Sequence, residues 1–318
     1  MATEIIIRQL LMFGILIAIG ALAFWRKIIT SEIKNNLARI VIDVTLPFLI
    51  FSTFANMEYD PKLIKNGLLV FGLAFSNLFI LYWLGKLSSR ILRLNVSQET
   101  VHSLHTMLGN IVFLGFPLLD ALFPDGLGVF YAAVYQLASN AVTFTFGVYK
   151  LSSGTHKGGW KSLINPNTIG LFLGALVLVS GFTLPSVIKV SFESLGKCTS
   201  PLSMVYIGAM LASMNIRKAV LQGSIYALAF NKLLLAPVLL GALYLFILNI
   251  IGIEISKVAF FVIMLQAAMP CQTIVVVLSH RYNGDHQLAG ANLFVTTLLS
   301  IVTLPLVYYL LEWIWLNI

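Results

Sequence analysis

Residues 107–148 read MLGNIVFLGFPLLDALFPDGLGVFYAAVYQLASNAVTFTFGV, and residues 267–285 read AAMPCQTIVVVLSHRYNGD. Each stretch is an apolar run that holds helix breakers beside uncharged polar side chains. These residues are Gly109, Asn110, Gly115 and Pro117 in the first stretch, and Pro270, Cys271, Gln272 and Thr273 in the second. Proline lacks a backbone N–H and clashes with the preceding helical turn. Both stretches therefore predict a helix that is broken inside an apolar environment, with breaks at Gly115, Pro117 and Pro270.

The composition around these stretches is that of a membrane protein. Of 318 residues, 59% are hydrophobic and 10% are charged, and the mean hydropathy is +0.93. A soluble domain has about 25% charged residues, so this chain has too little polar surface for an ordinary soluble enzyme. The net charge of +8 lies mainly in short loops. We therefore interpret it as a sign of membrane topology and expect no nucleic acid partner.

Apolar runs separated by polar loops predict ten membrane-spanning helices, because a span needs about 20 apolar residues. The predicted spans are 5–25, 37–57, 64–90, 100–122, 127–150, 165–183, 198–215, 222–250, 258–280 and 287–315. Basic residues concentrate in alternate loops, at Arg26, Lys27, Lys34, Arg39, Lys86, Arg90, Arg93, Lys150, Lys157, Lys161, Arg217, Lys218 and Arg281. By the positive-inside rule these loops are cytoplasmic, so both termini of a multi-pass protein of the cytoplasmic membrane lie outside.

A weak internal repeat divides the chain. TLPFLIFSTFANM begins at Thr45 and the similar TSPLSMVYIGAML begins at Thr199, and the two breaker-containing stretches have a comparable offset. We predict two five-helix repeats, 1–157 and 158–318. Because five is odd, the second repeat enters the membrane upside down, which is typical of secondary transporters. The expected fold is an all-α membrane protein.

Matched helix breaks predict a binding site at mid-membrane depth. Half-helix N-termini present positive dipole ends to an anion, and the amides of Asn110 and Gln272 can replace its water shell. Gln136 and Asn140 are one turn apart and share a helix face. Their amides serve either as ligands or as links between helices.

Two ionisable residues inside predicted spans are candidates for charge or ion coupling. Lys232 is either a counter-ion for an anionic substrate or a side chain that extends to the cytoplasmic surface. Asp43 either carries a proton or sodium ion or is a solvated or paired helix end. The histidines, including His102 and His105, lie near predicted inner loops, where we expect surface side chains or pH-sensitive caps.

Motifs for other chemistries are missing from the sequence. GTHKGGWK from Gly154 has Trp160 where a phosphate-binding loop requires lysine, and neither a zinc-protease motif nor a nucleophile elbow occurs. We therefore expect no enzyme activity, no cofactor and no metal site. Gly170 and Gly174 form a GxxxG pattern, which predicts a close contact with another helix.

The quoted stretches, together with LPFLIFSTFANM and INPNTIGLFLGALVL, resemble the auxin efflux carrier family of membrane transporters over essentially the whole chain. The resemblance implies two inverted repeats whose broken fourth and ninth helices cross at the substrate site, and a panel that moves like an elevator against a scaffold. It implies that Gly109, Asn110 and the segment Pro270–Gln272 line the crossing, with Gln136 and Asn140 beside it and Ser52 contributed by the second span. Gly109 stands where plant carriers have a crossing proline.

The expected function is a compact permease for a small organic anion, because members of this family move auxin in plants and malate or malonate in bacteria. Coupling to protons, to sodium or to the membrane potential alone remains open. The expected partners are the anion, the lipid membrane and, as an open alternative, a second copy of the chain in a homodimer. A membrane receptor or sensor that binds a small ligand without moving it is the alternative function.

Overall fold

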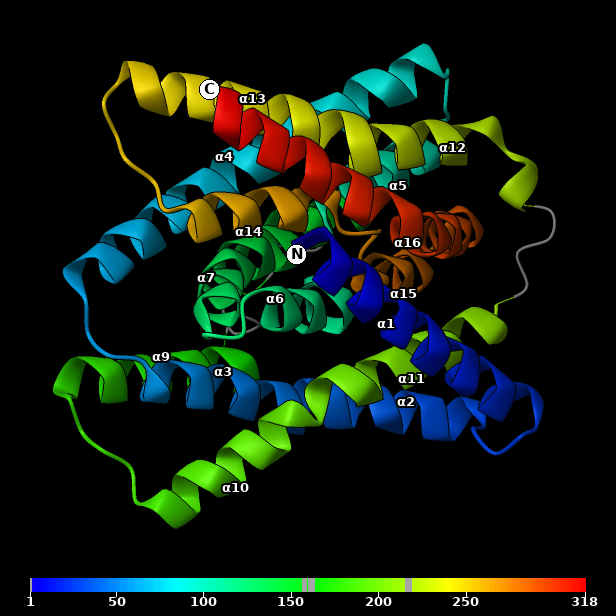
Figure 1. The fold of residues 1–318 in the computed structure, drawn as a ribbon. Helices are drawn as coiled ribbons and strands as arrows, with labels where there is room; N and C mark the ends of the chain where they lie inside the picture. Colours follow the sequence, from blue (N-terminus) through cyan, green and yellow to red (C-terminus); the bar gives the residue numbers. More distant parts are fainter. Residues whose placement is uncertain (1, 156–158, 160–163, 215–218) are drawn as a thin grey trace. The chain divides into compact units, whose positions relative to one another are not determined.

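The computed structural model describes residues 2–155, 159, 164–214 and 219–318, which fold almost entirely into helices (Figure 1). Over these residues there is no β-strand, and one isolated backbone bridge is the only β pairing. The predicted all-α class is confirmed for the described part of the chain. The predicted boundary between repeats at 157/158 and the basic residues Lys157, Lys161, Arg217 and Lys218 lie outside it.

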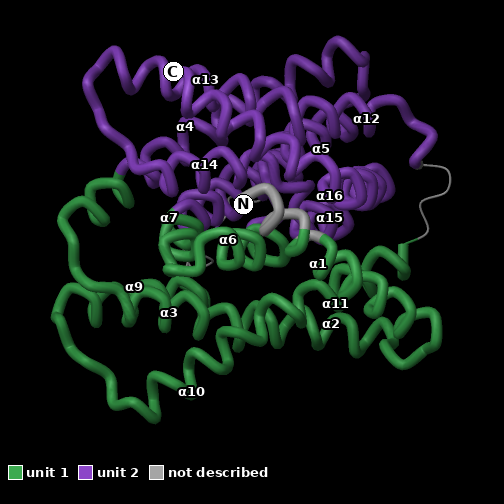
Figure 2. The backbone as a smooth tube through the Cα atoms, viewed as in Figure 1, with its two compact units in different colours: residues 1–68, 112–134, 163–214 green, residues 69–111, 135–162, 215–318 purple. Residues whose placement is uncertain are grey.

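The helices form two compact units, each of which takes segments from both halves of the sequence (Figure 2). Unit 1 comprises residues 1–68, 112–134 and 163–214, and unit 2 comprises residues 69–111, 135–162 and 215–318. These units differ from the predicted repeats because compact packing and internal repetition are separate properties of a chain. The division into two repeats therefore stays a prediction.

Unit 1 contains the N-terminal helices and those that pack on them. They are α1 (Ala2–Trp25), α2 (Ser31–Ile40), α3 (Leu46–Asn56), α6 (Phe116–Leu122), α9 (Pro166–Ser180), α10 (Ser186–Lys197) and α11 (Thr199–Ala212). α1 packs on α11, and α3 packs on α9 (Figure 1). A Cβ at Gly208 of α11 would overlap the carbonyl of Ile17, and a Cβ at Gly170 of α9 would lie 2.6 Å from the Pro47 carbonyl oxygen. The close contact predicted from Gly170 and Gly174 is thus confirmed, with α3 as its partner.

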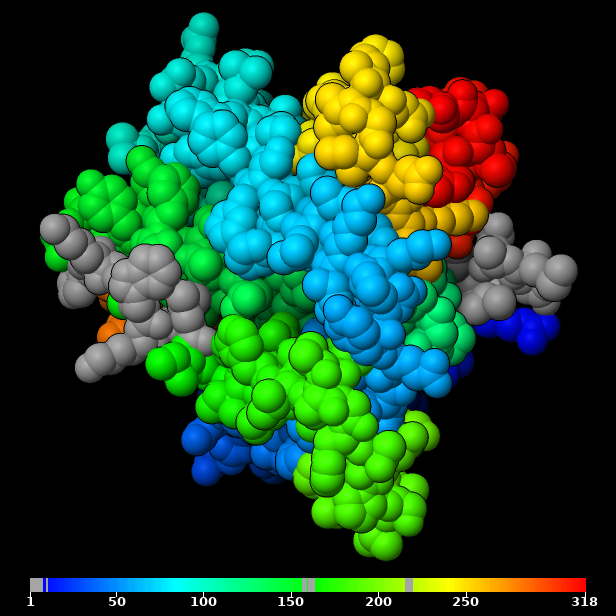
Figure 3. Space-filling view, turned by 90° about the vertical axis from the view of Figure 1, so that its left-hand side faces the viewer, coloured from blue at the N-terminus to red at the C-terminus, as the bar shows by residue number. Residues whose placement is uncertain are grey.

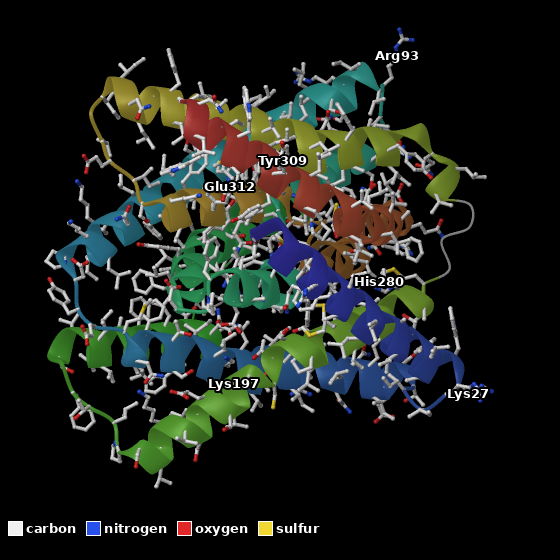
Figure 4. The ribbon with its side chains drawn as sticks, viewed as in Figure 1. Lys27, Arg93, Lys197, His280, Tyr309 and Glu312 are labelled. Carbon is white, nitrogen blue, oxygen red and sulfur yellow. The ribbon has the colours of Figure 1, made fainter. Side chains whose placement is uncertain are left out.

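Unit 2 contains the remaining helices. They are α4 (Pro61–Ile91), α5 (Val96–Met107), α7 (Leu127–Val142), α8 (Val148–Leu151), α12 (Gly223–Phe230), α13 (Ala236–Ile250), α14 (Lys257–Ala268), α15 (Thr273–Arg281) and α16 (His286–Asn317), with α4 and α7 beginning in unit 1. An ion pair joins the first turn of α14 to the end of α16, with 2.9 Å between Lys257 Nζ and Glu312 Oε1. Tyr308 donates to the same carboxylate at 3.2 Å, and Figure 4 labels Glu312.

Three helices widen into a π-helical turn shortly before a proline. These turns are η1 (Val41–Thr45) before Pro47, η2 (Ile111–Gly115) before Pro117 and η6 (Asn231–Leu235) before Pro237. A proline ring clashes with the carbonyl four residues earlier, and the wider turn accommodates the missing hydrogen bond. The helix therefore continues through these prolines. Gly115 ends η2 and Pro117 lies in the first turn of α6, so the predicted breaks at these two residues are wrong, and the interruption lies before them, at residues 108–110.

Within the described residues, four helical runs are long and apolar enough to cross a membrane: Ser31–Asn56, Pro61–Ile91, Gly223–Ile250 and His286–Asn317. Shorter apolar helices are Leu11–Trp25, Ile111–Leu122, Pro166–Ser180 and Lys257–Ala268. α4 exposes large apolar side chains, including Leu68, Phe79 and Trp83, along the surface drawn in blue to cyan in Figure 3. Such an exposed apolar helix is expected where lipid, rather than water, surrounds the protein.

Candidate functional site

Two helices of unit 2 are interrupted at the same place. α5 ends at Met107 and helical structure resumes at Ile111, while α14 ends at Ala268 and α15 begins at Thr273. The intervening segments, 108–110 and 269–272, lie against each other, and we call them the paired break. Both segments of the paired break belong to unit 2.

The paired break is held together by backbone hydrogen bonds. Gly109 and Cys271 form an antiparallel bridge. The N–H of Asn110 donates to the Pro270 carbonyl at 2.7 Å, and the N–H of Gln272 donates to the Leu108 carbonyl at 3.2 Å. These bonds pair groups that interrupted helices would otherwise leave unsatisfied in an apolar interior.

Close approach at the bridge requires glycine at position 109. A Cβ there would lie 2.8 Å from the Gln266 carbonyl oxygen and 3.0 Å from Cβ of Met269. The first contact is with backbone, which cannot rotate aside as a side chain can. Gly109 therefore allows the two segments to meet.

The buried ammonium of Lys232 lies at the C-terminal end of α5. Lys232 is 0% exposed, and its Nζ donates to the Thr106 carbonyl at 3.0 Å. The interpretation that this side chain extends to the surface is therefore wrong in the described structure. The helix C-terminus carries a partial negative charge that a cation stabilises. Among the described residues, no carboxylate forms an ion pair with Lys232.

α16 is hydrogen-bonded to the paired break through Thr296. Thr296 Oγ1 accepts a hydrogen bond from the N–H of Cys271 at 3.0 Å and donates to the Asn292 carbonyl at 2.6 Å. Asn292 Nδ2 lies 3.4 Å from Nδ1 of His105. Cys271 Sγ lies 3.9 Å from the carbonyl of His105.

His102 and His105 are buried, which corrects the expectation that they lie on the surface. Both are 0% exposed. His102 Nε2 lies 3.1 Å from Ser88 Oγ, and the same hydroxyl accepts from Asn231 Nδ2 at 3.0 Å. They lie in the C-terminal part of α5, residues 101–107, which is buried throughout.

α7 and the turn that follows it are tied to the broken helices at two points. Asn77 Nδ2 donates to Tyr135 Oη at 3.1 Å and approaches the Ile263 carbonyl at 3.4 Å. Thr143 Oγ1 donates to Oε1 of Gln272 at 3.4 Å. Gln136 and Asn140 lie on the turns of α7 between these two points, and Gln136 is 5% exposed.

Two predicted site residues belong to unit 1. The hydroxyl of Ser52 donates within its own helix to the Leu49 carbonyl at 3.2 Å. Asp43 Oδ2 lies 4.0 Å from Nε of Arg39, one turn earlier, and the side chain of Arg39 is 79% exposed and that of Asp43 48%. Asp43 is thus a paired helix residue, and its role in ion coupling stays a prediction, as does the role of Ser52.

Several polar atoms in unit 2 are buried with no hydrogen-bond partner among the described residues. They include both amide atoms of Gln266, Oγ1 of Thr273 and Oγ of Ser139. Buried polar groups are nearly always paired, so each such atom is a candidate contact for a ligand.

The sequence reasoning missed four residues that surround the paired break: His105, Thr143, Asn292 and Thr296. The pair Asn292 and Thr296 had a usable signal, because two polar residues one turn apart in a long apolar helix share a face. Thr143 had none, since isolated threonines are common in such helices.

Comparison with known proteins gives concordant results. A sequence profile described as membrane transport protein matches residues 5–158 and again residues 154–308. An uncharacterized transporter of Methanocaldococcus jannaschii is 28% identical over 313 residues, covering 95% of this chain and 96% of the relative. The uncharacterized transporter YfdV of Escherichia coli is 23% identical over 318 residues, covering 95% and 96%. An uncharacterized transporter of Methanothermobacter thermautotrophicus is 24% identical over 300 residues, covering 92% and 94%.

Proposed function

The chain belongs to this membrane transport protein family, and we propose that it is a secondary transporter that moves a small organic anion across the cytoplasmic membrane. The proposed substrates are carboxylates such as malate, malonate or an auxin-like acid. The paired break is the observation that carries this proposal. Here two helix interruptions are paired by the Gly109–Cys271 bridge, the amides of Asn110 and Gln272 belong to the paired segments, and the ammonium of Lys232 binds the adjoining end of α5.

The charge balance of the paired break favours an anion over a cation. A buried ammonium with no carboxylate partner is costly in a medium of low polarity. A bound carboxylate would supply the missing negative charge to Lys232. It would also accept hydrogen bonds from the amides of Asn110 and Gln272. These features support the roles proposed for Asn110, Gln272 and Lys232.

We place this site in a ten-span arrangement of two inverted five-helix repeats, with both termini outside. The similarity between the stretches that begin at Thr45 and Thr199, and the matched helix breaks, support the two-repeat arrangement. Alternating access would then come from an elevator-like movement of one bundle against another. Protons, sodium ions or the membrane potential would drive the movement; the potential supplies about 2.3 kcal/mol per charge per 100 mV.

Uptake into proteoliposomes tests the proposal. The purified chain is reconstituted and screened with radiolabelled mono- and dicarboxylates under imposed pH and sodium gradients. We expect saturable uptake of at least one carboxylate, with the responding gradient identifying the coupling ion. Binding without flux under every gradient would favour a receptor or sensor, and neither binding nor flux would refute the proposed substrate class.

A further inference from the structure

A cavity of about 330 Å³ lies in unit 2 between α4, α5 and the turn after α8. Its walls include Tyr82 and Lys86 of α4, Ser103 of α5, and Tyr149 and Lys150 of α8. No residue of the paired break lines it. The volume is at the lower end of the range of small-molecule sites, which begins at about 300 Å³.

We propose that this cavity binds a phosphate-bearing group, such as the headgroup of an anionic phospholipid. Two lysines from different helices line its wall, and basic pockets between membrane helices on the cytoplasmic side bind such headgroups. Both lysines lie near the C-terminal ends of their helices, at ends that the charge distribution places on the cytoplasmic side. The inference is independent of the transported substrate.

A buried hydroxyl in the wall points to a ligand independently of the lysines. Ser103 is 1% exposed, and its Oγ has no hydrogen-bond partner among the described residues. Neighbouring hydroxyls on α5 are already used, since Thr100 Oγ1 donates to the Val96 carbonyl at 2.9 Å. A phosphate oxygen in the cavity would accept from Ser103 and satisfy it.

Glu99 is the one carboxylate in the wall, and it does not neutralise the lysines. No ion pair joins it to Lys86 or Lys150 in the part of the chain that the structure describes. It lies in the first turn of α5, where the helix dipole stabilises a negative charge. Two ammoniums against one carboxylate leave the wall with a net positive charge.

Aromatic side chains beside the two lysines support a position of the cavity at the level of a membrane interface. Lys86 Nζ lies 5.3 Å from the centre of the Trp83 ring, and Trp83 is 49% exposed. Lys150 Nζ lies 5.6 Å from the Phe146 ring, which packs edge-on against Tyr82 at 4.8 Å. Exposed tryptophan beside lysine is typical of the zone where lipid headgroups begin.

Native mass spectrometry of the full chain in detergent tests the proposal with added phosphatidylglycerol. We expect the double variant Lys86→Gln/Lys150→Gln to bind this lipid roughly thirtyfold more weakly, because each lysine near a headgroup contributes about 1 kcal/mol. Ser103→Ala should weaken it by a smaller factor. The matched control is Arg90→Gln/Arg93→Gln, which removes the same charge from the same end of α4. Figure 4 shows Arg93 pointing away from the helices, and neither arginine lines the cavity.

Two further arms identify the source of the phosphate. Phosphatidylcholine should bind more weakly than phosphatidylglycerol, because its headgroup has no net charge. Saturable binding of sn-glycerol 3-phosphate with the same dependence on Lys86 and Lys150 would support the site with a soluble ligand as its source. Equal losses in the two double variants, equal affinity for both lipids, or no saturable binding of any probe would overturn the proposal.

Discussion

Lys232 donates a hydrogen bond from its buried ammonium to the carbonyl of Thr106 at 3.0 Å, one residue before α5 ends. The contact places a full positive charge at the negative end of a helix dipole. It also leaves that charge without a carboxylate partner among the described residues.

Replacing Lys232 with methionine should separate binding from stability. Lys232→Met leaves the Thr106 carbonyl unpaired, at a cost of about 1–3 kcal/mol, but it also removes a buried charge. We expect an apparent melting temperature close to that of the unaltered protein and an anion affinity reduced by roughly thirtyfold or more. Calorimetric titration with the carboxylate identified by uptake measures the affinity.

Lys257→Met is the control for Lys232→Met, because Lys257 forms a partly exposed ion pair with Glu312. Such pairs contribute about 0–1 kcal/mol, so both affinity and stability should change little. Unchanged anion affinity in Lys232→Met would show that Lys232 stabilises the C-terminus of α5 and does not bind the anion.

Gly109→Ala should loosen the paired break. The added methyl would lie 2.8 Å from the Gln266 carbonyl oxygen, and overpacking of this kind typically costs about 1–3 kcal/mol. We expect a lower apparent melting temperature in detergent and slower uptake. Gly72→Ala in α4 is the matched control, because nothing lies within 4 Å of its Cβ position. Equal stability of the two variants would contradict the close approach at Gly109.

Gly208→Ala should weaken the packing of α1 on α11. Its Cβ would overlap the Ile17 carbonyl, so the two backbones would have to separate. Gly14→Ala in α1 has open space around its Cβ, and replacing a helical glycine with alanine favours the helix by about 1 kcal/mol. Thermal unfolding in detergent should therefore shift downward for Gly208→Ala and upward, or not at all, for Gly14→Ala. The packing account fails if Gly208→Ala is as stable as the unaltered chain.

The two cysteines should differ sharply in reactivity. Cys198 is exposed and Cys271 is buried, with Cys271 at 0% exposure. In a Cys198→Ser background, a membrane-permeant maleimide should label Cys271 far more slowly than it labels Cys198 in a Cys271→Ser background. Full labelling of Cys271 after denaturation provides the control. Equally fast labelling of the two native-state thiols would contradict the burial of the paired break.

Composition and apolar periodicity were sufficient to predict an all-helical membrane protein. The predicted spans 64–90, 222–250 and 287–315 correspond to the continuous helical runs 61–91, 223–250 and 286–317. Long apolar runs are the strongest signal in a sequence. The sequence did not predict which helices pack together. Gly170 and Gly174 predicted a close helix contact, but only the structure identifies α3 as the partner.

The position of the break shows a limit of reasoning from residue types. Pro117 is a helix breaker by its chemistry, yet a π-helical turn ahead of it lets the helix continue. The interruption instead follows from the pairing of Gly109 with Cys271, which joins residues far apart in the chain. His105 was misplaced for a similar reason, since burial depends on neighbours that are distant in sequence.

The central claim is that the anion binds at the paired break. Thermal stabilisation by substrate, measured on Asn110→Ala, is its most direct test. At a concentration of one hundred times Kd, a ligand stabilises the folded protein by about 2.7 kcal/mol. We predict that the unaltered protein and Asn249→Ala, whose side chain bonds to the chain terminus, show this stabilisation with the transported carboxylate. Asn110→Ala should melt normally without the carboxylate and gain no stability from it. Full stabilisation of Asn110→Ala by the carboxylate would contradict the account.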